Sequence, residues 1–423
     1  MAINAVIGAQ WGDEGKGKII DILSSDADVV VRAQGGNNAG HTITRGEEIY
    51  KFRLMPSGIL CKDTLCLIGN GVVLDPRYLL KEIKYLEKRG IDCGNLRIDP
   101  RAHVIMPWHI EIDTLAEALR GDNKIGTTRR GIGPCYMDKA DRSGIRIYDL
   151  IHPDLCRQKT LRSGIAKNRM ISRYYEGEEL NLRAIADEYI EYGKELKKYV
   201  ADISVLIYDA VKDEKNILFE GAQGSLLDID TGTYPYVTSS STVAGGFSTG
   251  GGIGPVLFEN VVGVAKAYTT RVGEGPFPTE FSNEIAEILC KRGCETGIAG
   301  RSCRVGWFDS VIVRHAVRVN GLTSLAFNKL DTFRDIGRIK VCTAYRKPDG
   351  TIMNNFPPAL EELDGCTPVY TEFEGFYEDI TGCESYDALP SACKNYIESL
   401  EELCGCRISM VGVGPERRQT LMR

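Results

Sequence analysis

The segment that most restricts the fold of this chain of 423 residues lies near its N-terminus, at residues 5–23. It consists of the apolar run A-V-I (5–7), the glycine-rich stretch G-A-Q-W-G-D-E-G-K-G-K (8–18) and the helix-like I-I-D-I-L (19–23). We interpret this order as a buried strand, a loop and a helix. At such a junction, backbone N–H groups and the positive end of the helix dipole meet at one place, which is how many proteins bind phosphate.

The loop follows the P-loop spacing except at one position. Gly12 is followed, after four residues, by Gly17 and Lys18, but Ile19 stands where that motif has a Ser or Thr hydroxyl for magnesium. A magnesium ion would therefore need another ligand, and Asp13 inside the loop is the evident carboxylate. Taken by itself, the loop is equally compatible with a strand-to-helix turn that carries spare charges.

Length and composition exclude several classes of protein. The chain is long enough for a large core, and we expect one elaborated domain over residues 1–423, because no Pro/Ser-rich or acidic linker interrupts the alternating strands and helices. The 52 basic and 58 acidic residues give a net charge of −6, so there is no electrostatic reason to expect nucleic acid as a partner. The sequence has no signal-like segment and no run of about eighteen apolar residues, so we expect a cytoplasmic protein without membrane contact.

The fourteen cysteines do not form paired C-x-x-C units. Structural zinc is therefore not expected, and neither are disulfides in a cytosolic chain. We expect most of these cysteines to act as small buried hydrophobes.

Polar groups follow several of the predicted strands. The strand at 28–32 leads into Q-G-G-N-N-A-G-H-T (34–42), which contains His41, one of only five histidines. The strand at 216–220 leads into glycines that expose Gln223. A histidine among glycines after a strand is suited to contact a ligand, although a solvent-facing imidazole on a turn is the alternative for His41 alone.

The middle of the chain combines scaffold and one further polar loop. We expect a helix over 75–90 with Asp75 as N-cap, Pro76 at its first position and Gly90 closing it, and another over 107–119. The loop G-T-T-R-R-G-I-G-P (126–134) carries hydroxyls and guanidinium groups that suit a phosphate, with a solvated basic turn as the alternative. Residues 153–212 are charged and helical in period, so we expect helices packed on the exterior of the sheet.

Two glycine- and proline-containing segments follow. The segment 244–254 is so rich in glycine that we expect backbone wrapped around a ligand or a loop that moves, rather than core packing. The strand at 261–268 leads into a rigid polar turn over 269–278.

A base-reading element is indicated near the C-terminus. The strand at 325–327 delivers N-K-L-D (328–331), which has the form of the N-K-x-D guanine reader of GTP-binding proteins. In that motif the Asp carboxylate accepts from the ring N–H and the exocyclic amine of guanine, and adenine lacks this donor pair. The strand at 407–411 precedes residues 412–417, which are placed to close over the same base.

Together these loops indicate a protein that uses a nucleoside triphosphate, and their order resembles one family. The chain resembles adenylosuccinate synthetase over essentially its full length, through segments 10–18, 34–41, 126–128 with 131–134, 220–224, 232–238 and 329–331. The resemblance implies an α/β, P-loop-like fold with a large, mostly parallel central sheet flanked by helices, with additional helical and loop insertions. It also implies a homodimer that uses Mg²⁺ and GTP to ligate L-aspartate to IMP through a 6-phosphoryl-IMP intermediate, giving adenylosuccinate, GDP and phosphate.

The resemblance also implies roles for individual residues. Asp13 would take the N1 proton of IMP and would ligate magnesium together with the Gly40 carbonyl, while His41 would stabilise charge on the transferring phosphoryl group and Gln223 would contact IMP at the reacting centre. The residues implied to hold GTP are Gly12, Glu14, Gly15, Lys16, Gly17, Lys18, Gly40, Thr42, Lys329, Leu330, Asp331, Gly412, Val413 and Gly414. Those implied to contact IMP or aspartate are Asn38, Ala39, Thr128, Thr238, Val272, Arg301 and Arg304, with Arg142 of the partner subunit on the IMP phosphate.

One segment departs from the family pattern. The amino-acid loop reads G-I-A-G-R-S-C-R-V-G-W (297–307), which we interpret as one residue shorter than the pattern, without its Thr pair and with Cys303 in place of an arginine. We therefore expect weaker binding of aspartate than in the family pattern, with Arg304 or Arg271 as possible substitutes. Two alternatives stay open: a paralogue that joins another amine to IMP or a related purine, and a catalytically silent GTP-binding protein, against which the retained Asp13 and His41 argue.

The base reader generates a first prediction, which is that the protein uses GTP in preference to ATP and that Asp331→Asn relaxes this preference. A site that hydrogen-bonds a donor pair rejects an analogue without it, and we expect the variant to lower the GTP/ATP ratio of kcat/KM by about 100-fold or more. Steady-state kinetics with both nucleotides measure this ratio. Equal use of ATP by the parent protein would refute the assignment of Asp331.

Overall fold

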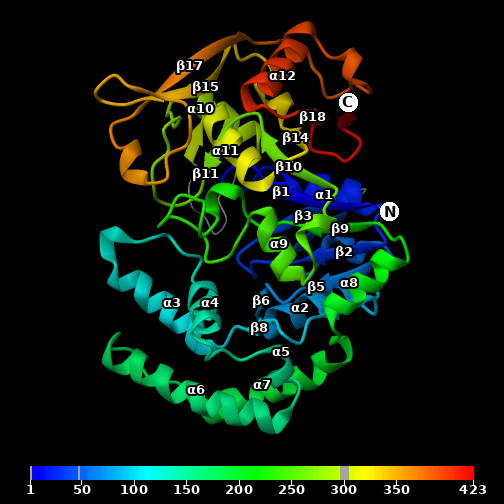
Figure 1. Ribbon diagram of the computed structural model, residues 1–423, viewed down its shortest axis with the longest axis vertical. Helices are drawn as coiled ribbons and strands as arrows, with labels where there is room; N and C mark the ends of the chain where they lie inside the picture. The colour runs from blue at the N-terminus through cyan, green and yellow to red at the C-terminus, as the bar shows by residue number, and fades with distance from the viewer. Residues whose placement is uncertain (1, 46–47, 296–303) are drawn as a thin grey trace.

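The computed structural model of the protein describes residues 2–45, 48–295 and 304–423, and a nine-stranded sheet runs through the middle of this part of the chain (Figure 1). All neighbouring strands of this sheet pair in parallel, except that β18 and β19 are antiparallel. In spatial order the strands are β19 (Thr420–Met422), β18 (Ile408–Gly412), β14 (Ser324–Asn328), β10 (Asn260–Lys266), β1 (Ile3–Gly8), β9 (Ile217–Glu220), β2 (Val29–Arg32), β5 (Leu65–Ile68) and β7 (Leu96–Ile98). The predicted α/β fold with a mostly parallel sheet is confirmed.

The apolar run near the N-terminus forms the central strand β1. Ala5 of β1 pairs with Val261 of β10 on one side and with Phe219 of β9 on the other. Ala5, Val6 and Ile7 are fully buried, because parallel strands in an α/β sheet are covered on both faces. This is why the strand reads as a continuous apolar run rather than as an alternation.

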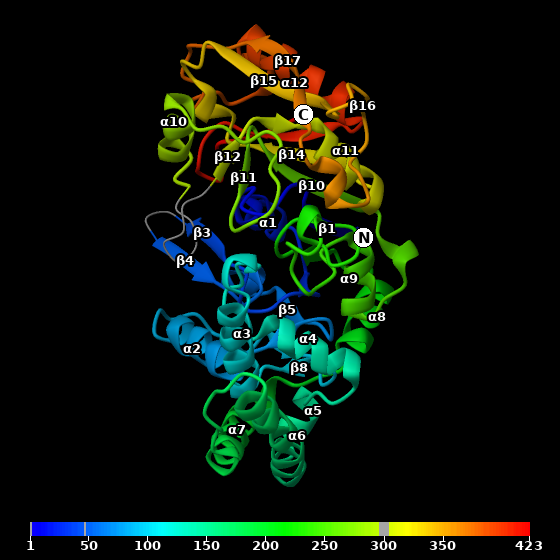
Figure 2. The ribbon, with the colours of Figure 1, turned by 90° about the vertical axis from the view of Figure 1, so that its left-hand side faces the viewer.

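The remaining strands are short pairs and one smaller sheet. They are β3 (His41–Arg45) with β4 (Glu48–Phe52), β6 (Val73–Leu74) with β8 (His103–Val104), β11 (Thr269–Arg271) with β12 (Arg304–Gly306), and β13 (Phe308–Asp309), β15 (Arg338–Arg346), β16 (Ile352–Met353) and β17 (Thr367–Glu374). The smaller sheet lies with α12 at the end of the molecule opposite α6 and α7 (Figures 1 and 2).

The α-helices of the described residues surround these sheets. They are α1 (Lys16–Ser24), α2 (Pro76–Glu87), α3 (Pro107–Leu119), α4 (Ile132–Asp141), α5 (Ile147–Leu150), α6 (Pro153–Arg173), α7 (Leu182–Leu196), α8 (Ile203–Lys212), α9 (Ala244–Gly251), α10 (Glu284–Arg292), α11 (Ser310–Asn320) and α12 (Ser391–Cys404). No helix among the described residues is both long and apolar enough to cross a membrane.

The predicted start of α2 is confirmed in detail. The Asp75 carboxylate accepts hydrogen bonds from the backbone N–H groups of Arg77 and Tyr78, which caps the helix N-terminus. The helix ends at Glu87, and Gly90 follows with a φ of +76°. The bounds predicted for α3 are also those observed.

The prediction that residues 153–212 cover the exterior of the sheet was wrong for α6 and α7. These helices pack against each other and against α2 and α5, at one end of the molecule (Figures 1 and 2). Their apolar side chains, such as Ile171 and Tyr189, extend a hydrophobic cluster that begins on β5 and β7. The third helix of this range, α8, lies against the middle of the sheet, where Ile207 joins the cluster that contains Phe219. An amphipathic period shows that a helix covers an apolar surface, but not which surface.

Two predicted loops are partly regular structure. The loop predicted over 126–134 ends at Gly131, whose φ of +74° makes it the N-cap of α4, so that Ile132, Gly133 and Pro134 form the first helical turn. The turn predicted over 269–278 begins with the strand β11, which pairs with β12.

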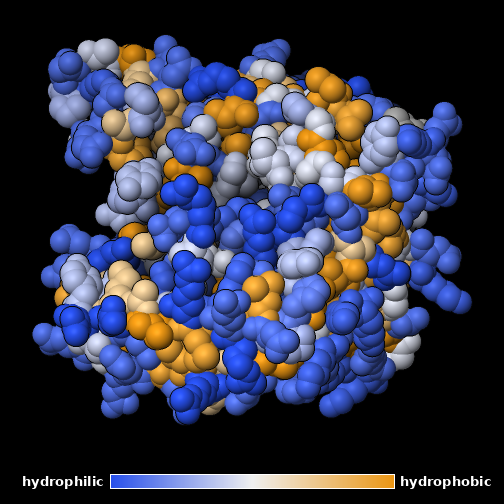
Figure 3. Space-filling model, turned by 60° about the horizontal axis from the view of Figure 1, so that its bottom comes forward, coloured by the Kyte–Doolittle hydropathy of each residue, from blue (hydrophilic) through white to orange (hydrophobic). Residues whose placement is uncertain are grey.

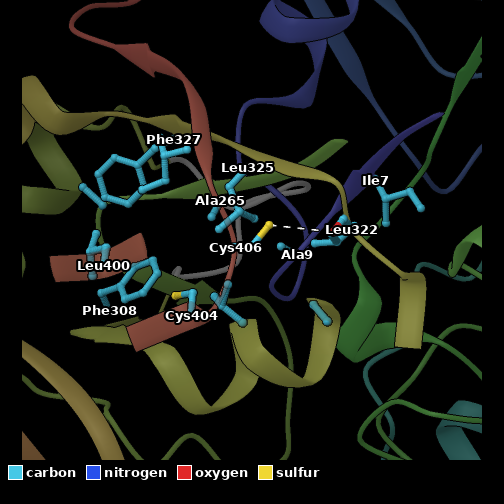
Figure 4. Packing of buried hydrophobic residues seen from close by; sticks show 14 of the residues in the cluster. Ile7, Ala9, Ala265, Phe308, Leu322, Leu325, Phe327, Leu400, Cys404 and Cys406 are labelled. Carbon is cyan, nitrogen blue, oxygen red and sulfur yellow. Dashed lines mark hydrogen bonds between the residues drawn. The ribbon is translucent and has the colours of Figure 1, made fainter. Parts of the chain in front are cut away.

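Cysteines pack as apolar side chains in the core. Cys404 and Cys406 lie among Leu322, Leu325 and Phe308 (Figure 4), and all thirteen cysteines that the structure describes are free thiols. Burial raises the pKa of Cys406 to about 11, so this thiol is protonated at neutral pH. Eight of the thirteen are buried, which confirms the expected role for most of those described.

The prediction that residues 244–254 form a loop that moves was wrong for residues 244–251, whereas contact of this backbone with a ligand stays a prediction. Residues 244–251 form α9, and Gly250 lies so close to the neighbouring loop that an added Cβ would be 1.9 Å from the carbonyl oxygen of Ala33. Gly69 and Gly71 contact the same part of α9 through their backbone. The glycines therefore allow a helix to pack directly against backbone, which a count of glycines does not reveal.

This packing predicts opposite effects for two glycines of one helix. We expect Gly250→Ala to lower the free energy of unfolding by about 1–3 kcal/mol, because the methyl group overpacks a backbone contact. Gly245→Ala is the control: an added Cβ there meets nothing within 4 Å, and alanine should stabilise the helix by about 0.5–1 kcal/mol. Urea unfolding measures both values, and a similar change in the two variants would contradict this account of α9.

Candidate active site

Loops that follow six neighbouring strands meet at the carboxyl edge of the sheet. In spatial order these strands are β18, β14, β10, β1, β9 and β2. Asp331 follows β14, Asp13 follows β1, Gln223 follows β9 and His41 follows β2. The sheet thus places the N-K-L-D segment on one side of the glycine loop and Gln223 and His41 on the other, as expected for a site at the carboxyl ends of parallel strands.

The glycine loop has an unusual backbone that a neighbouring strand supports. Gly12, Asp13 and Gly15 have φ values of +89°, +56° and +84°, and α1 begins directly afterwards at Lys16. The side-chain amide of Asn328 donates to the carbonyl oxygens of Glu14 (2.9 Å) and Gly15 (3.2 Å). The asparagine of the N-K-L-D segment therefore braces the loop, a role that the sequence analysis did not assign.

Glu14 occupies the donors of its own loop. Its carboxylate accepts from the backbone N–H groups of Gln10 (3.0 Å) and Gly12 (2.9 Å) and lies 2.5 Å from the ammonium of Lys16. The carboxylate is fully buried. A phosphate group bound by Lys16 and this loop would compete with Glu14 for the same donors.

His41 lies in a buried pocket of opposed charges. The Ser57 hydroxyl is 3.4 Å from Nδ1 of His41, and the Glu220 carboxylate is 3.8 Å away. Burial, together with the positive charges of Arg32 and Lys16, lowers the pKa of His41 to about 3, so the imidazole is neutral at pH 7. Arg32 and Glu220 were missed as site residues, although each is a charged residue at the end of a predicted buried strand, which is the signal that identifies them.

Side chains implied to contact IMP come together beside His41. The Asn38 amide donates to the Thr238 hydroxyl at 3.4 Å. Gln223 has a φ of +60° and packs against Gly35, and neither its amide oxygen nor its amide nitrogen has a hydrogen-bond partner among the described residues. Tyr136 of α4 holds this region by donating to the Gly71 carbonyl and accepting from Gly35 N–H.

A cavity of about 310 Å³ lies beside Asp331. The lining residues are Arg292, Asp331, Arg334, Asp335, Asp379, Ile380 and Thr381. Lys18 of α1 donates to the Gly414 carbonyl at 2.9 Å, which brings the segment after β18 to the glycine loop, and burial lowers the pKa of Lys18 to about 8. Burial also raises the pKa of Asp331.

The other predicted residues lie along the same edge or near it. Gly17 contacts the Thr42 carbonyl, and Ala39 is buried while Gly40 is exposed with open space beside it. Val272 follows β11, Leu330 is buried in the turn after β14, and Gly412 and Val413 are buried at the end of β18. Thr128 and Arg142 are exposed, the latter as the C-cap of α4 with a φ of +65°.

The residues proposed to meet aspartate are only partly described. Arg301 and Cys303 lie outside the described residues. Arg304 forms two hydrogen bonds to the Glu280 carboxylate, and Arg271 is buried over the Trp11 ring and donates to the Pro276 carbonyl and to Thr233. Both arginines therefore already have protein partners, and their contact with aspartate stays a prediction.

This fold and site define a P-loop-like α/β enzyme that binds a purine nucleoside triphosphate, and comparisons with known proteins identify the family. Residues 5–421 match the adenylosuccinate synthetase family. The chain is 53% identical to the adenylosuccinate synthetase of Acetivibrio thermocellus over 423 residues, covering 100% of both, and 53% identical to that of Listeria monocytogenes over 421 residues, covering 99% of this chain and 98% of the relative.

Solved structures agree with this result. A fully ligated adenylosuccinate synthetase from Plasmodium falciparum is 35% identical, with a TM-score of 0.94 and complete coverage of both chains. A succinoaminodeoxyadenylate synthetase from cyanophage S-2L, at 20% identity and a TM-score of 0.63, shares the fold.

The chain belongs to the adenylosuccinate synthetase family, as its motifs indicated. Enzymes of this family are ligases of purine biosynthesis that form a C–N bond between IMP and aspartate at the expense of GTP. These relatives give no support to a different amine or to a silent GTP-binding protein.

The buried His41 predicts how stability depends on pH. Because the folded pKa is about 3 and the unfolded value is about 6.5, the unfolded chain binds a proton first as pH falls, and stability is lost progressively below pH 6.5. Between pH 7 and pH 5, protonation of this histidine in the unfolded chain should lower the free energy of unfolding by about 2 kcal/mol. The His41→Asn variant has no such group, so its free energy of unfolding should fall by about that much less over the same range. Urea unfolding at both pH values tests this, and identical pH slopes for parent and variant would contradict it.

Proposed function

We propose that the residues at this edge of the sheet carry out the family reaction, the GTP-dependent ligation of L-aspartate to IMP, in the roles that the motifs implied. The observation that supports this most is the spatial order of the loops. Across the sheet, the guanine-reader segment comes first, the glycine loop next, and Gln223 with His41 last. This is the order in which the guanine base, the phosphates and the acceptor IMP would lie.

The chemical problem explains the polar groups on the acceptor side. The C6 oxygen of hypoxanthine is a poor leaving group, so it is first phosphorylated and then displaced by the amine. Asp13 takes the N1 proton, which makes O6 a nucleophile, and its side chain is exposed within the loop where a substrate can reach it. The Gln223 amide, which has no hydrogen-bond partner among the described residues, offers an NH₂ donor group and an acceptor oxygen to the purine ring.

His41 acts as a neutral hydrogen-bond donor in this proposal. An imidazole with a lowered pKa keeps one N–H at neutral pH, and this group stabilises negative charge on the transferring phosphoryl group. The same N–H can donate to the phosphorylated oxygen as the C6–O bond breaks and its electron pair goes to the departing phosphate.

The loop residues fit a magnesium ion. Magnesium prefers oxygen ligands, and the Asp13 carboxylate and the Gly40 carbonyl are oxygen donors on neighbouring loops, with open space beside Gly40. When bound, the ion would neutralise charge on the GTP phosphates. Asp331 would accept from the guanine donor pair, with Lys329, Leu330 and Gly414 around the base.

We further propose that the active unit is a homodimer, in which Arg142 of the partner subunit contacts the IMP phosphate. Arg142 is exposed at the end of α4, and exposed apolar side chains lie near it in the chain: Met137 on α4, Tyr148 on α5 and Ile165 on α6. Figure 3, which brings the helical end of the molecule forward, shows hydrophobic residues among hydrophilic ones on that end. We expect this dimer in the cytoplasm.

The direct test is incubation with GTP, Mg²⁺, IMP and aspartate, with the product identified by mass. Adenylosuccinate should form, and Asp13→Asn should lower the rate about 10²- to 10⁴-fold, because the amide cannot accept the N1 proton. A variant that keeps most of its rate would remove the role of Asp13.

Mixing two inactive chains tests the shared site. In a hybrid of Asp13→Asn and Arg142→Leu chains, one of the two sites carries both parental residues, so random exchange should restore about a quarter of the parent activity. Each variant alone is the control. No recovery after demonstrated exchange of protomers would count against a site shared between subunits.

A further inference from the structure

One lysine without a role in the proposed chemistry is fully buried beside the glycine loop. Lys266 ends β10, and its ammonium donates to the carbonyl oxygen of Asp13 (3.0 Å), the hydroxyl of Thr270 (2.5 Å) and the carboxylate of Glu295 (2.9 Å). An ammonium has three N–H donors, and each of them here has an acceptor. A buried charge that is so fully paired is fixed in position.

Lys266 holds the loop at two places. Its backbone N–H donates to the Gln10 amide oxygen (3.2 Å), its carbonyl accepts from the Gln10 amide nitrogen (3.3 Å), and its side chain binds the Asp13 carbonyl. In the stretch that runs from Gln10 to Asp13, the residues Gly12 and Asp13 both have positive φ. Asp13 is not a glycine, so its left-handed backbone needs support from the surrounding structure, and the Lys266 ammonium provides such support.

Glu295 connects this support to the guanine side of the site. One oxygen of its carboxylate accepts from Lys266 (2.9 Å), from Lys329 (2.6 Å) and from the Tyr268 hydroxyl (2.5 Å), and the side chain is only 6% exposed. Burial would raise the pKa of Glu295, but the two lysines outweigh burial and lower it. Lys329, the second residue of the N-K-L-D segment, is another residue with a left-handed backbone, with a φ of +62°.

We propose that Lys266 is a positioning residue for the ligase reaction: its buried ammonium, held by Glu295 and Thr270, fixes the Asp13 backbone and thereby aims the carboxylate that takes the N1 proton. This inference rests on the proposed role of Asp13. It also assigns Glu295 as the link through which the loop of the general base and the guanine reader are held in one arrangement.

The test is Lys266→Met, which keeps the length of the side chain and removes all three donors. A small misplacement of a catalytic group costs about 100-fold in rate, so we expect kcat to fall by about that factor. The KM values for IMP and GTP should change less than about threefold, because the interaction that is lost acts on the chemical step. Lys291→Met, on the exposed surface of nearby α10, is the matched control and should leave kcat and KM unchanged.

A second comparison separates positioning from general damage. Because Lys266 acts through Asp13, adding Lys266→Met to an Asp13→Asn chain should lower the residual rate by less than about threefold. Glu295→Gln is nearly isosteric and serves if Lys266→Met does not fold, as judged by its melting temperature. We expect Glu295→Gln to lower kcat and also to raise the KM for GTP, since it loosens Lys329 as well.

The outcomes are distinct. A folded Lys266→Met protein with kcat within twofold of the parent overturns the inference, and so does an undiminished loss in the Asp13→Asn background. If Lys266→Met does not fold, a Glu295→Gln protein with parental kcat overturns it. A parent protein that forms no adenylosuccinate overturns the proposed function itself. This outcome is distinguished from failure of the inference about Lys266 because the parent is measured before any variant.

Discussion

The parallel pairing of β1 with β9 and β10 is the constraint on which the rest of the structure depends. It buries the apolar run at 5–7 on both faces and fixes where the glycine loop leaves the sheet. Because β2, β14 and β18 continue the same parallel order, their carboxyl ends carry His41, Asp331 and Gly414 to one edge. A change in strand order would leave the motifs intact in the sequence and would separate them in space.

Buried charges then hold these loops in register. Lys266 and Lys329 share Glu295, while Arg32 and Glu220 flank His41. Isolated buried charges are costly, and replacing such pairs by apolar groups is often neutral for stability, so the network is better explained by the arrangement that it specifies. The same low-dielectric surroundings keep His41 neutral, which makes it a donor toward a phosphoryl group rather than a permanent cation.

Sequence patterns predicted local features where the responsible interaction is itself local. The Asp75 cap depends on groups two and three residues away, and the left-handed backbone at Gly12 and Gly15 depends on glycine itself. The patterns misled where the responsible partner is distant in sequence. Gly250 is small because α9 contacts the backbone of Ala33 there, and α6 and α7 are amphipathic because they cover each other, α2 and the hydrophobic cluster that begins on β5 and β7.

The sequence by itself determined the central strand, the glycine loop, the strand that delivers the N-K-L-D segment, and the family, because each rests on contiguous residues whose order is their signal. Only the tertiary structure decided which side chains support them. Asn328 braces the loop, Glu14 occupies its donors and Lys266 holds Asp13. The contacts of Asn328 and Lys266 with the loop join residues that are more than two hundred positions apart in the chain. The physical reason is that a hydrogen bond depends on distance and direction in space, and strand order sets both.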